Sequence, residues 1–232
     1  MSSTAPARPE GRIAVANSNP AYGWFERRAA TELDASLIDT PAALNARALA
    51  DDGIARVVFP HWSSIIPAEV YERFECILFH MTDLPYGRGG SPLQNLIVRG
   101  HETTMLTAIR VAGGIDTGPI YLKRPLSLNG TATEIFLRAE RIMWDMTLEI
   151  LRHDIQPQPQ TGEAAERFRR RKPQDGSIAE LTELSRVYDH IRMLDGEGYP
   201  RAFVDLPGLR LEFSRASLKP DEVIADVRIT KR

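Results

Sequence analysis

Residues 76–94 read CILFHMTDLPYGRGGSPLQ, and this stretch decides how the fold is interpreted. It opens on four apolar residues, Cys76–Phe79, an uninterrupted run typical of a parallel strand that is covered on both faces. The strand ends at His80, and a glycine-rich loop then leads to Ser91–Pro92. A serine followed by a proline predicts the N-cap and first position of a helix, which is expected over 93–98.

Upstream of this stretch, short apolar runs alternate with helical segments. That order predicts an α/β domain with a mainly parallel, Rossmann-like sheet. Strands are expected at 12–16, 35–39, 55–59 and 76–79, and helices at 21–32, 41–50 and 67–74, the second of these with Thr40 as N-cap and Pro41 as its first residue. Ligands of such sheets bind beyond the carboxyl ends of the strands. Three polar segments follow those ends, Asn17–Asn19, Pro60–Ser63 and His80–Asp83, so the pattern predicts a site there.

Downstream, two strands are expected at 105–111 and 120–128, around the loop AGGIDTG at 112–118. A long amphipathic helix should follow at 133–152, because Thr131 and Glu134 have the spacing of a capping box. The tail predicts a helix at 178–193 and three short strands at 201–206, 209–214 and 223–230. The expected organisation is a disordered lead (1–11), a catalytic domain (12–155), a Pro/Gln-rich linker (156–176) and a small α+β C-terminal domain (177–232) that packs on the first.

Composition excludes several classes of protein. The chain has 232 residues and 43% hydrophobic content, enough for one full core and a small appendage. Its 29 basic and 31 acidic residues give a net charge of -2, which argues against a dedicated nucleic-acid binder. We therefore interpret the basic run 167–172 as a solvated linker face. The sequence predicts no membrane span and no metal site, and its one cysteine, Cys76, is expected in the core of a cytoplasmic protein.

The stretch 76–94, together with Gly114–Gly118, resembles the folate-dependent formyltransferase family, which includes methionyl-tRNA and sugar N-formyltransferases. The positions in register are His80, Leu84–Pro85, Arg88–Gly89, Pro92 and Asp116–Gly118. The resemblance implies transfer of a formyl group from N10-formyltetrahydrofolate, as donor co-substrate, to a primary amine. The small size and balanced charge favour a small acceptor, such as an amino sugar linked to a nucleotide, over tRNA. The sequence does not decide the oligomeric state, and a homodimer is one alternative.

The resemblance also assigns roles to residues. His80 and Asp116 are expected to be catalytic, because amine attack on a formyl carbon needs an oxyanion donor and a proton acceptor. His61 is a third catalytic candidate. Contacts with the folate are expected from Phe59, His61, Trp62, Ile115 and Asp116, and contacts with the acceptor from Asn17, Asn19, Thr82, Arg88 and Asn95.

One position departs from the family pattern. The family has Asn two residues before the catalytic histidine, where this chain has Leu78. Losing one oxyanion donor typically costs about 10²–10³ in rate, so another group, with His61 and Asn95 as candidates, has to substitute. Two alternatives follow from the same departure. One is a relative with altered chemistry, such as hydrolysis of the formyl donor or transfer of another acyl group, and the other is a non-catalytic binding module.

Overall fold

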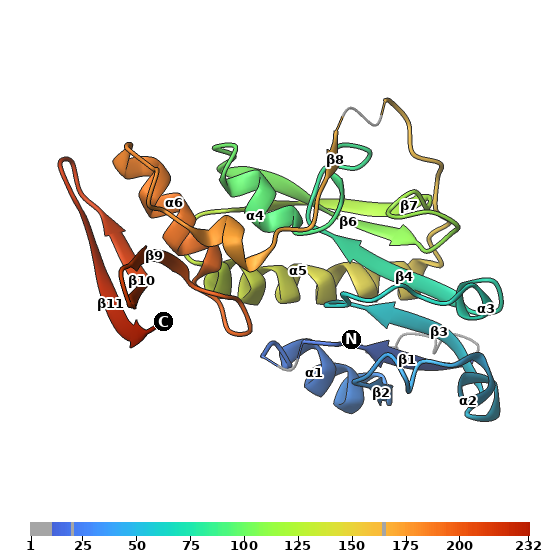
Figure 1. Cartoon of the computed structure of the whole chain (residues 1–232). Coiled ribbons are helices and arrows are strands. Elements are labelled where there is room, and N and C mark those ends of the chain that lie inside the picture. Colours follow the sequence, from blue (N-terminus) through green and yellow to red (C-terminus); the bar gives the residue numbers. More distant parts are fainter. Residues whose placement is uncertain (1–10, 20, 164–165) are drawn as a thin grey trace, which may run out of the picture.

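The computed structural model describes residues 11–19, 21–163 and 166–232. Most of the expected lead, 1–10, lies outside the described residues. The elements, drawn in Figure 1, are β1 (Arg12–Ala16), α1 (Trp24–Glu32), β2 (Ser36–Ile38), α2 (Ala46–Asp51), β3 (Ile54–Phe59), α3 (Ala68–Tyr71), β4 (Glu75–His80), β5 (Arg88–Gly89), α4 (Pro92–Ile97), β6 (Thr103–Arg110), β7 (Ile120–Ser127), α5 (Ala132–His153), β8 (Arg167–Phe168), the 3₁₀ turn η1 (Pro173–Gly176), α6 (Leu184–Leu194), β9 (Ala202–Leu206), β10 (Leu209–Leu218) and β11 (Val223–Lys231).

The main sheet has the strand order β2-β1-β3-β4-β6-β7. The first four strands pair in parallel, and β6 and β7 are antiparallel, which confirms the expected α/β class. Successive residues of a strand face opposite sides, so the sheet builds two cores. In β1, Ile13 and Val15 face the core that contains α1 and α5, whereas Ala14 and Ala16 face the core beneath α2 and α3.

The long helix α5 spans one face of the sheet (Figure 1). Its N-terminus has the expected capping box: Thr131 accepts a hydrogen bond from the Glu134 amide, and the Glu134 carboxylate accepts one from the Thr131 amide. Cys76 is a core thiol, as expected, and burial raises its pKa to about 12. Among the described residues, every helix is too short or too polar to cross a lipid bilayer.

Three predicted helix starts were wrong. The helix expected from 21 begins at Trp24, and the helix expected over 67–74 is shorter and ends at Tyr71. Pro41–Ala43 form a turn instead of a first helical turn, and α2 begins only at Ala46. The reason is the stronger cap at Asn45, whose side-chain oxygen accepts a hydrogen bond from the Ala48 amide at 2.8 Å. The helix expected from 178 begins at Leu184, because the backbone of Ser177 and Ile178 pairs with Phe203 of β9.

The segment between α5 and α6 differs from a free linker. Gln158 pairs with Ile120 of β7, and the short strand β8 pairs in parallel with β5. The chain therefore returns along the catalytic domain before it enters the C-terminal unit. That unit consists of α6 and the antiparallel sheet β11-β10-β9, and α6 contacts both α4 and α5 (Figure 1).

Candidate active site

A cavity of about 1230 Å³ opens beyond the carboxyl ends of β3 and β4. It lies where the sequence predicts a site, and its walls come from the turn after β1, the Pro60–Pro67 loop, the end of β4, the loop between β6 and β7, and the segment from β8 to η1. Single ligands usually occupy sites of roughly 300–1,000 Å³, so the space suits two substrates side by side.

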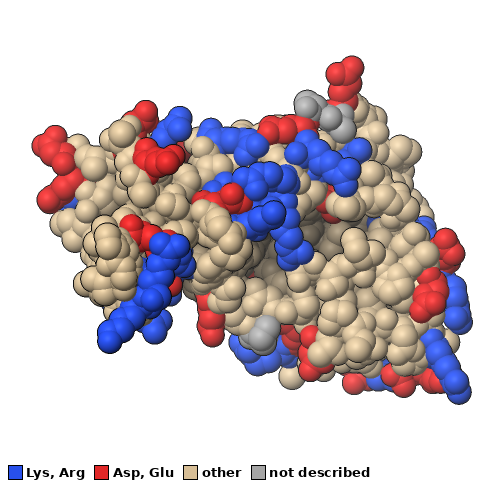
Figure 2. Space-filling model, in the orientation of Figure 1, with Lys and Arg blue, Asp and Glu red and all other residues tan. Residues whose placement is uncertain are grey.

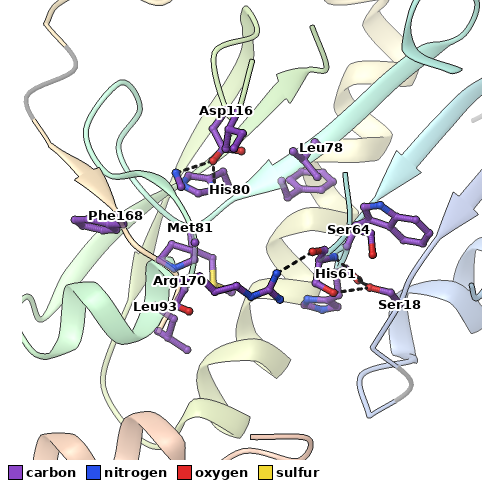
Figure 3. A pocket seen from close by; sticks show the side chains of 18 of the residues that line it. Ser18, His61, Ser64, Leu78, His80, Met81, Leu93, Asp116, Phe168 and Arg170 are labelled. Atoms are coloured by element: carbon purple, nitrogen blue, oxygen red, sulfur yellow. Dashed lines mark hydrogen bonds and ion pairs between the residues drawn. The ribbon is translucent and has the colours of Figure 1, made fainter. Parts of the chain in front are cut away.

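His80 and Asp116 meet in this cavity, although they are 36 positions apart (Figure 3). His80 is the last residue of β4, and Asp116 lies in the β6–β7 loop. The Nδ1 atom of His80 is 3.6 Å from Asp116 Oδ2, and both side chains are less than one tenth exposed. Asp116 adopts a left-handed backbone conformation (φ 54°), which aspartate tolerates better than most residues.

Backbone groups fix the orientation of this pair. The Gly89 amide donates a hydrogen bond to Asp116 Oδ2 at 2.8 Å, and His80 Nε2 lies 2.9 Å from the Gly87 carbonyl oxygen. Because a carbonyl only accepts, Nε2 carries the hydrogen of that bond. The other ring nitrogen faces a carboxylate, so both nitrogens of His80 point at hydrogen-bond acceptors.

Leu78 lies two residues before His80 on β4, and therefore on the same face of the strand. It also lines the cavity, so an apolar side chain stands where the family pattern has an amide (Figure 3). The replacement of the family's amide by an apolar side chain therefore lies in the cavity wall.

His61 lines the opposite side of the same cavity. The rings of Tyr22 and Phe136 flank its imidazole, at centroid distances of 5.5 and 5.6 Å. Its Nε2 atom is 3.7 Å from Oε1 of Glu140, a residue in the middle of α5 that is only 1% exposed. The sequence analysis missed Glu140. A signal existed, because Phe136, Glu140, Met143 and Thr147 are spaced along one helix face, and a charge on a buried stripe is unusual.

The structure brings about half of the predicted contact residues to the cavity. Those that line it are Asn19, His61, Trp62, His80, Ile115 and Asp116. Phe59 is fully buried behind Trp62, and Asn17 uses its amide on the Tyr22 carbonyl. Thr82 is also fully buried. These three predicted contacts therefore support the wall without forming its surface.

Arg88 and Asn95 also lie outside the cavity surface. Arg88 donates two hydrogen bonds to Gln160 Oε1, and Gln160 in turn donates to the Asp116 carbonyl at 2.8 Å. Asn95 donates to the carbonyls of Gly90 and Arg169, each at 2.9 Å. Both amide hydrogens of Asn95 are therefore committed to backbone, which leaves His61 as the better placed candidate to substitute for the missing amide.

The basic segment after β8 is part of the site. Phe168 is buried, and Arg170, Arg171 and Lys172 line the cavity, so the basic run is mostly exposed, as expected, but it is also part of the cavity wall. Arg170 reaches across to donate a hydrogen bond to the Ser63 carbonyl at 3.1 Å (Figure 3). Arg171 is anchored by its backbone amide, which donates to Ser91 Oγ at 3.1 Å.

The described residues contain no group of three or more His, Cys, Asp or Glu side chains arranged to hold a metal ion.

Comparison with known proteins gives consistent relatives. A family model described as "Methionyl-tRNA formyltransferase, C-terminal domain" matches residues 173–230. The methionyl-tRNA formyltransferase of Sorangium cellulosum is 30% identical over 226 residues, which cover 93% of this chain and 71% of the relative. A solved methionyl-tRNA formyltransferase from Clostridium thermocellum is 47% identical, with a TM-score of 0.89 over 95% of this chain and 99% of that one. A Mycobacterium tuberculosis protein described as a likely sugar N-formyltransferase shares the fold, at 18% identity and a TM-score of 0.72 over 91% of this chain and 99% of that one.

Proposed function

This chain belongs to the formyltransferase family that includes methionyl-tRNA formyltransferase, and on that premise we propose that it transfers a formyl group from N10-formyltetrahydrofolate to a primary amine. The acceptor we propose is a small, phosphate-bearing amine such as a nucleotide-linked amino sugar. The observation that carries the proposal is the His80–Asp116 pair, buried and fixed by backbone bonds at the end of β4, in a cavity with room for donor and acceptor.

The chemistry sets the roles of these residues. The amine nitrogen attacks the formyl carbon, an oxyanion forms, and the bond from that carbon to N10 of the donor then breaks. Nε2 of His80 carries the hydrogen of the bond to Gly87, and a hydrogen on Nδ1 as well would make the ring a cation that stabilises the developing negative charge, with the Asp116 carboxylate 3.6 Å away to hold it in place. His80 therefore serves as the electrostatic element, while Leu78 contributes no hydrogen bond.

We propose that the donor binds against Trp62 and Ile115, which both line the cavity. Trp62 offers a flat aromatic surface on which a pterin ring stacks, and its Nε1 atom is buried without a hydrogen-bond partner among the described residues. Titration calorimetry with N5-formyltetrahydrofolate tests this assignment. Saturable binding that Trp62→Ala weakens is the expected result, and equal binding by both proteins would contradict it.

A phosphate-bearing acceptor is favoured by the cations of the cavity wall. Arg170, Arg171 and Lys172 form no ion pair with a carboxylate in the described part of the chain. Burial lowers the pKa of Arg171, a sign that its charge is poorly solvated. Figure 2 shows basic side chains gathered beside the central hollow, over the segment between β8 and α6. An anionic group bound there would neutralise them.

Methionyl-tRNA is the second candidate acceptor, because the relatives named above carry that name and the same cations could bind the phosphates of a tRNA end. A direct assay separates the two. The protein is incubated with N10-formyltetrahydrofolate and either a panel of nucleotide-linked amino sugars or charged initiator tRNA, and formylated products are measured by mass spectrometry.

The proposal expects a sugar product that His80→Ala abolishes. Product from the tRNA alone would replace the sugar as acceptor. Formate release without any amine product would instead support the altered chemistry that Leu78 suggests. Wild-type activity no greater than that of His80→Ala would indicate a binding module.

A further inference from the structure

A cluster of buried polar groups lies behind the cavity wall at His61. It combines the carboxylate of Glu140 from α5 with the carboxylate of Glu26 from the first turn of α1. All four carboxylate oxygens and His61 Nε2 are buried and have no hydrogen-bond partner within 3.5 Å among the described residues. Buried polar groups normally have partners, so this concentration needs an explanation.

The cluster has an excess of negative charge. Two carboxylates share the space, and the one group nearby that can become a cation is His61, whose Nε2 is 3.7 Å from Glu140 Oε1. Glu26 belongs to the same electrostatic unit: burial raises its pKa, polar contacts with its own backbone and with Asn17 lower it, and among the nearby charges His61 lowers it and Glu140 raises it. With two carboxylates buried here, the ring nitrogen of His61 that faces Glu140 is placed to donate a hydrogen to that carboxylate.

The geometry also decides which nitrogen of His61 faces the substrates. Nε2 faces Glu140, and the flanking rings of Tyr22 and Phe136 restrict rotation of the imidazole. The Nδ1 atom makes no hydrogen bond to any described residue, and the side chain lines the cavity. A carboxylate that binds one ring nitrogen of a histidine leaves the other as the proton acceptor.

The reaction needs such a group, because His80 is poorly placed for it. Nε2 of His80 donates to the Gly87 carbonyl and Nδ1 faces the Asp116 carboxylate at 3.6 Å, so both ring nitrogens are directed at groups of the protein. His61 is the other histidine of the cavity wall. The two histidines thus divide the work between charge stabilisation and proton transfer.

We propose that Glu140 is a positioning residue that holds Nε2–H of His61, so that Nδ1 accepts the proton lost by the amine, and that Glu26 supports the resulting cation. The inference rests on the proposed formyl transfer. The amine nitrogen bonds to the formyl carbon and gives its proton to His61 Nδ1. The same proton passes to N10 of the donor as the bond between the formyl carbon and N10 breaks, so the atoms balance and His61 is regenerated.

The titratable and charged groups that face His61 are few. They are Tyr22 and Glu26 from α1 and the segment before it, Glu140 from α5, and Arg170, which crosses the cavity to the neighbouring Ser63 carbonyl. The two carboxylates carry negative charge and the guanidinium carries positive charge. Since Glu140 is the nearest, its removal should have the largest effect on His61.

The test combines ring-nitrogen NMR with kinetics. Proton–nitrogen spectra of the histidine rings, titrated from pH 5 to 9 (roughly, spanning ordinary histidine titration), are compared for wild type, Glu140→Gln and Glu26→Gln, with His61→Gln used to assign the signal. Glu149→Gln is the matched control, because Glu149 lies on the same helix in an exposed pair with Arg124.

The proposal expects His61 of the wild type to carry its hydrogen on Nε2 when neutral. The tautomer preference and the ring-nitrogen chemical shifts of His61 should change most in Glu140→Gln, less in Glu26→Gln and not at all in Glu149→Gln, because the group that binds one ring nitrogen sets which nitrogen carries the hydrogen. An unchanged tautomer in Glu140→Gln would overturn the inference, whatever the activity of that variant.

Kinetics give the second readout. His61→Gln should lower kcat/KM by about 10², and the double variant His61→Gln/Glu140→Gln should lose no more than His61→Gln alone, because residues that act as a unit are not additive. Additive losses would overturn the shared role. An absence of product from wild type with every amine would sink the formyl transfer, and with it the proton-transfer step, while the NMR coupling would still be visible.

Discussion

The carboxylate of Asp116 accepts a hydrogen bond from the Gly89 amide, and the same oxygen lies 3.6 Å from Nδ1 of His80. Asp116→Asn keeps the size of the side chain and removes its charge. We expect kcat/KM to fall by about 10²–10³, with little change in the affinity for N5-formyltetrahydrofolate, because the lost effect belongs to the charged transition state. Steady-state kinetics and calorimetry measure the two effects. A loss confined to KM would contradict the role given to Asp116.

Glu26 predicts a pH-dependent stability. Burial raises its pKa in the folded state above the ordinary 4.5, so between these two values the folded protein holds more protons than the unfolded chain. Ionised Glu26 therefore destabilises the fold above its raised pKa, and the penalty disappears as the pH falls toward 4.5. Glu26→Gln should raise stability at pH 7 by about 1 kcal/mol, or roughly 2–4 °C in Tm, and give no advantage at pH 4. Thermal unfolding at both pH values checks this, and an equal gain at both would contradict it.

At the scale of single residues, the sequence predicted residues of the cavity wall where they follow the end of a strand or belong to the motif that resembles the family, and their roles stay predictions. His80, Asp116, His61 and Trp62 are of this kind. It could not predict that Arg171 turns inward, because that depends on a backbone hydrogen bond to Ser91, 80 positions away. A local sequence pattern does not predict long-range contacts of this kind.

The short pairing of β5 with β8 joins the basic segment to the loop between β4 and α4. This pairing requires a glycine at position 89. A Cβ at Gly89 would come within 2.2 Å of the Phe168 carbonyl oxygen, and its φ is 113°. Gly89→Ala should separate the two strands, weaken the hydrogen bond from the Gly89 amide to Asp116 and reduce kcat/KM at least tenfold, at the scale of a misplaced catalytic group.

Gly100→Ala is the matched control, because Gly100 also has a positive φ, 80°, but nothing lies within 4 Å of the added atom. That variant should lose about 1 kcal/mol of stability and keep its activity. Similar activities of the two alanine variants would show that the β5–β8 contact is unimportant for the site.

The elements themselves were predictable where composition and periodicity agree. The apolar runs of β3 and β4 and the capped amphipathic pattern of α5 leave little ambiguity. The start of α6 could not be predicted from the sequence. Residues 178–183 have helical character, but the backbone of this segment is partly used in pairing with β9. Tertiary hydrogen bonds overrode local preference there.

The C-terminal unit is joined to the rest of the molecule through Arg192 of α6. Its guanidinium is buried, donates to the carbonyls of Leu128 and Gly130, and pairs with Asp189. Arg192→Met should leave these groups unpaired and cost ~2–4 kcal/mol, hence roughly 5–15 °C in Tm. Arg228→Met, at an exposed and distant pair with Glu212, should cost little.

Calorimetry of the same proteins tests whether the molecule is one cooperative unit. Tyr199 and Pro200 line the cavity together with residues of the catalytic domain, so we expect a single unfolding transition in the wild type and in Arg192→Met. Two separate transitions in the wild type would show that the C-terminal unit unfolds independently of the sheet.

The contribution of Tyr199 and Pro200 to the cavity wall also bears on how the protein is made. Synthesis proceeds from the N-terminus, and the parallel strands β1 to β4, which end at His80, are complete early. The cavity lacks part of its wall until residue 200 of 232 has left the ribosome. A nascent chain can therefore build its sheet before the cavity wall is complete, and a chain terminated before this point would carry both histidines of the site in a cavity that lacks the part of its wall supplied by Tyr199 and Pro200.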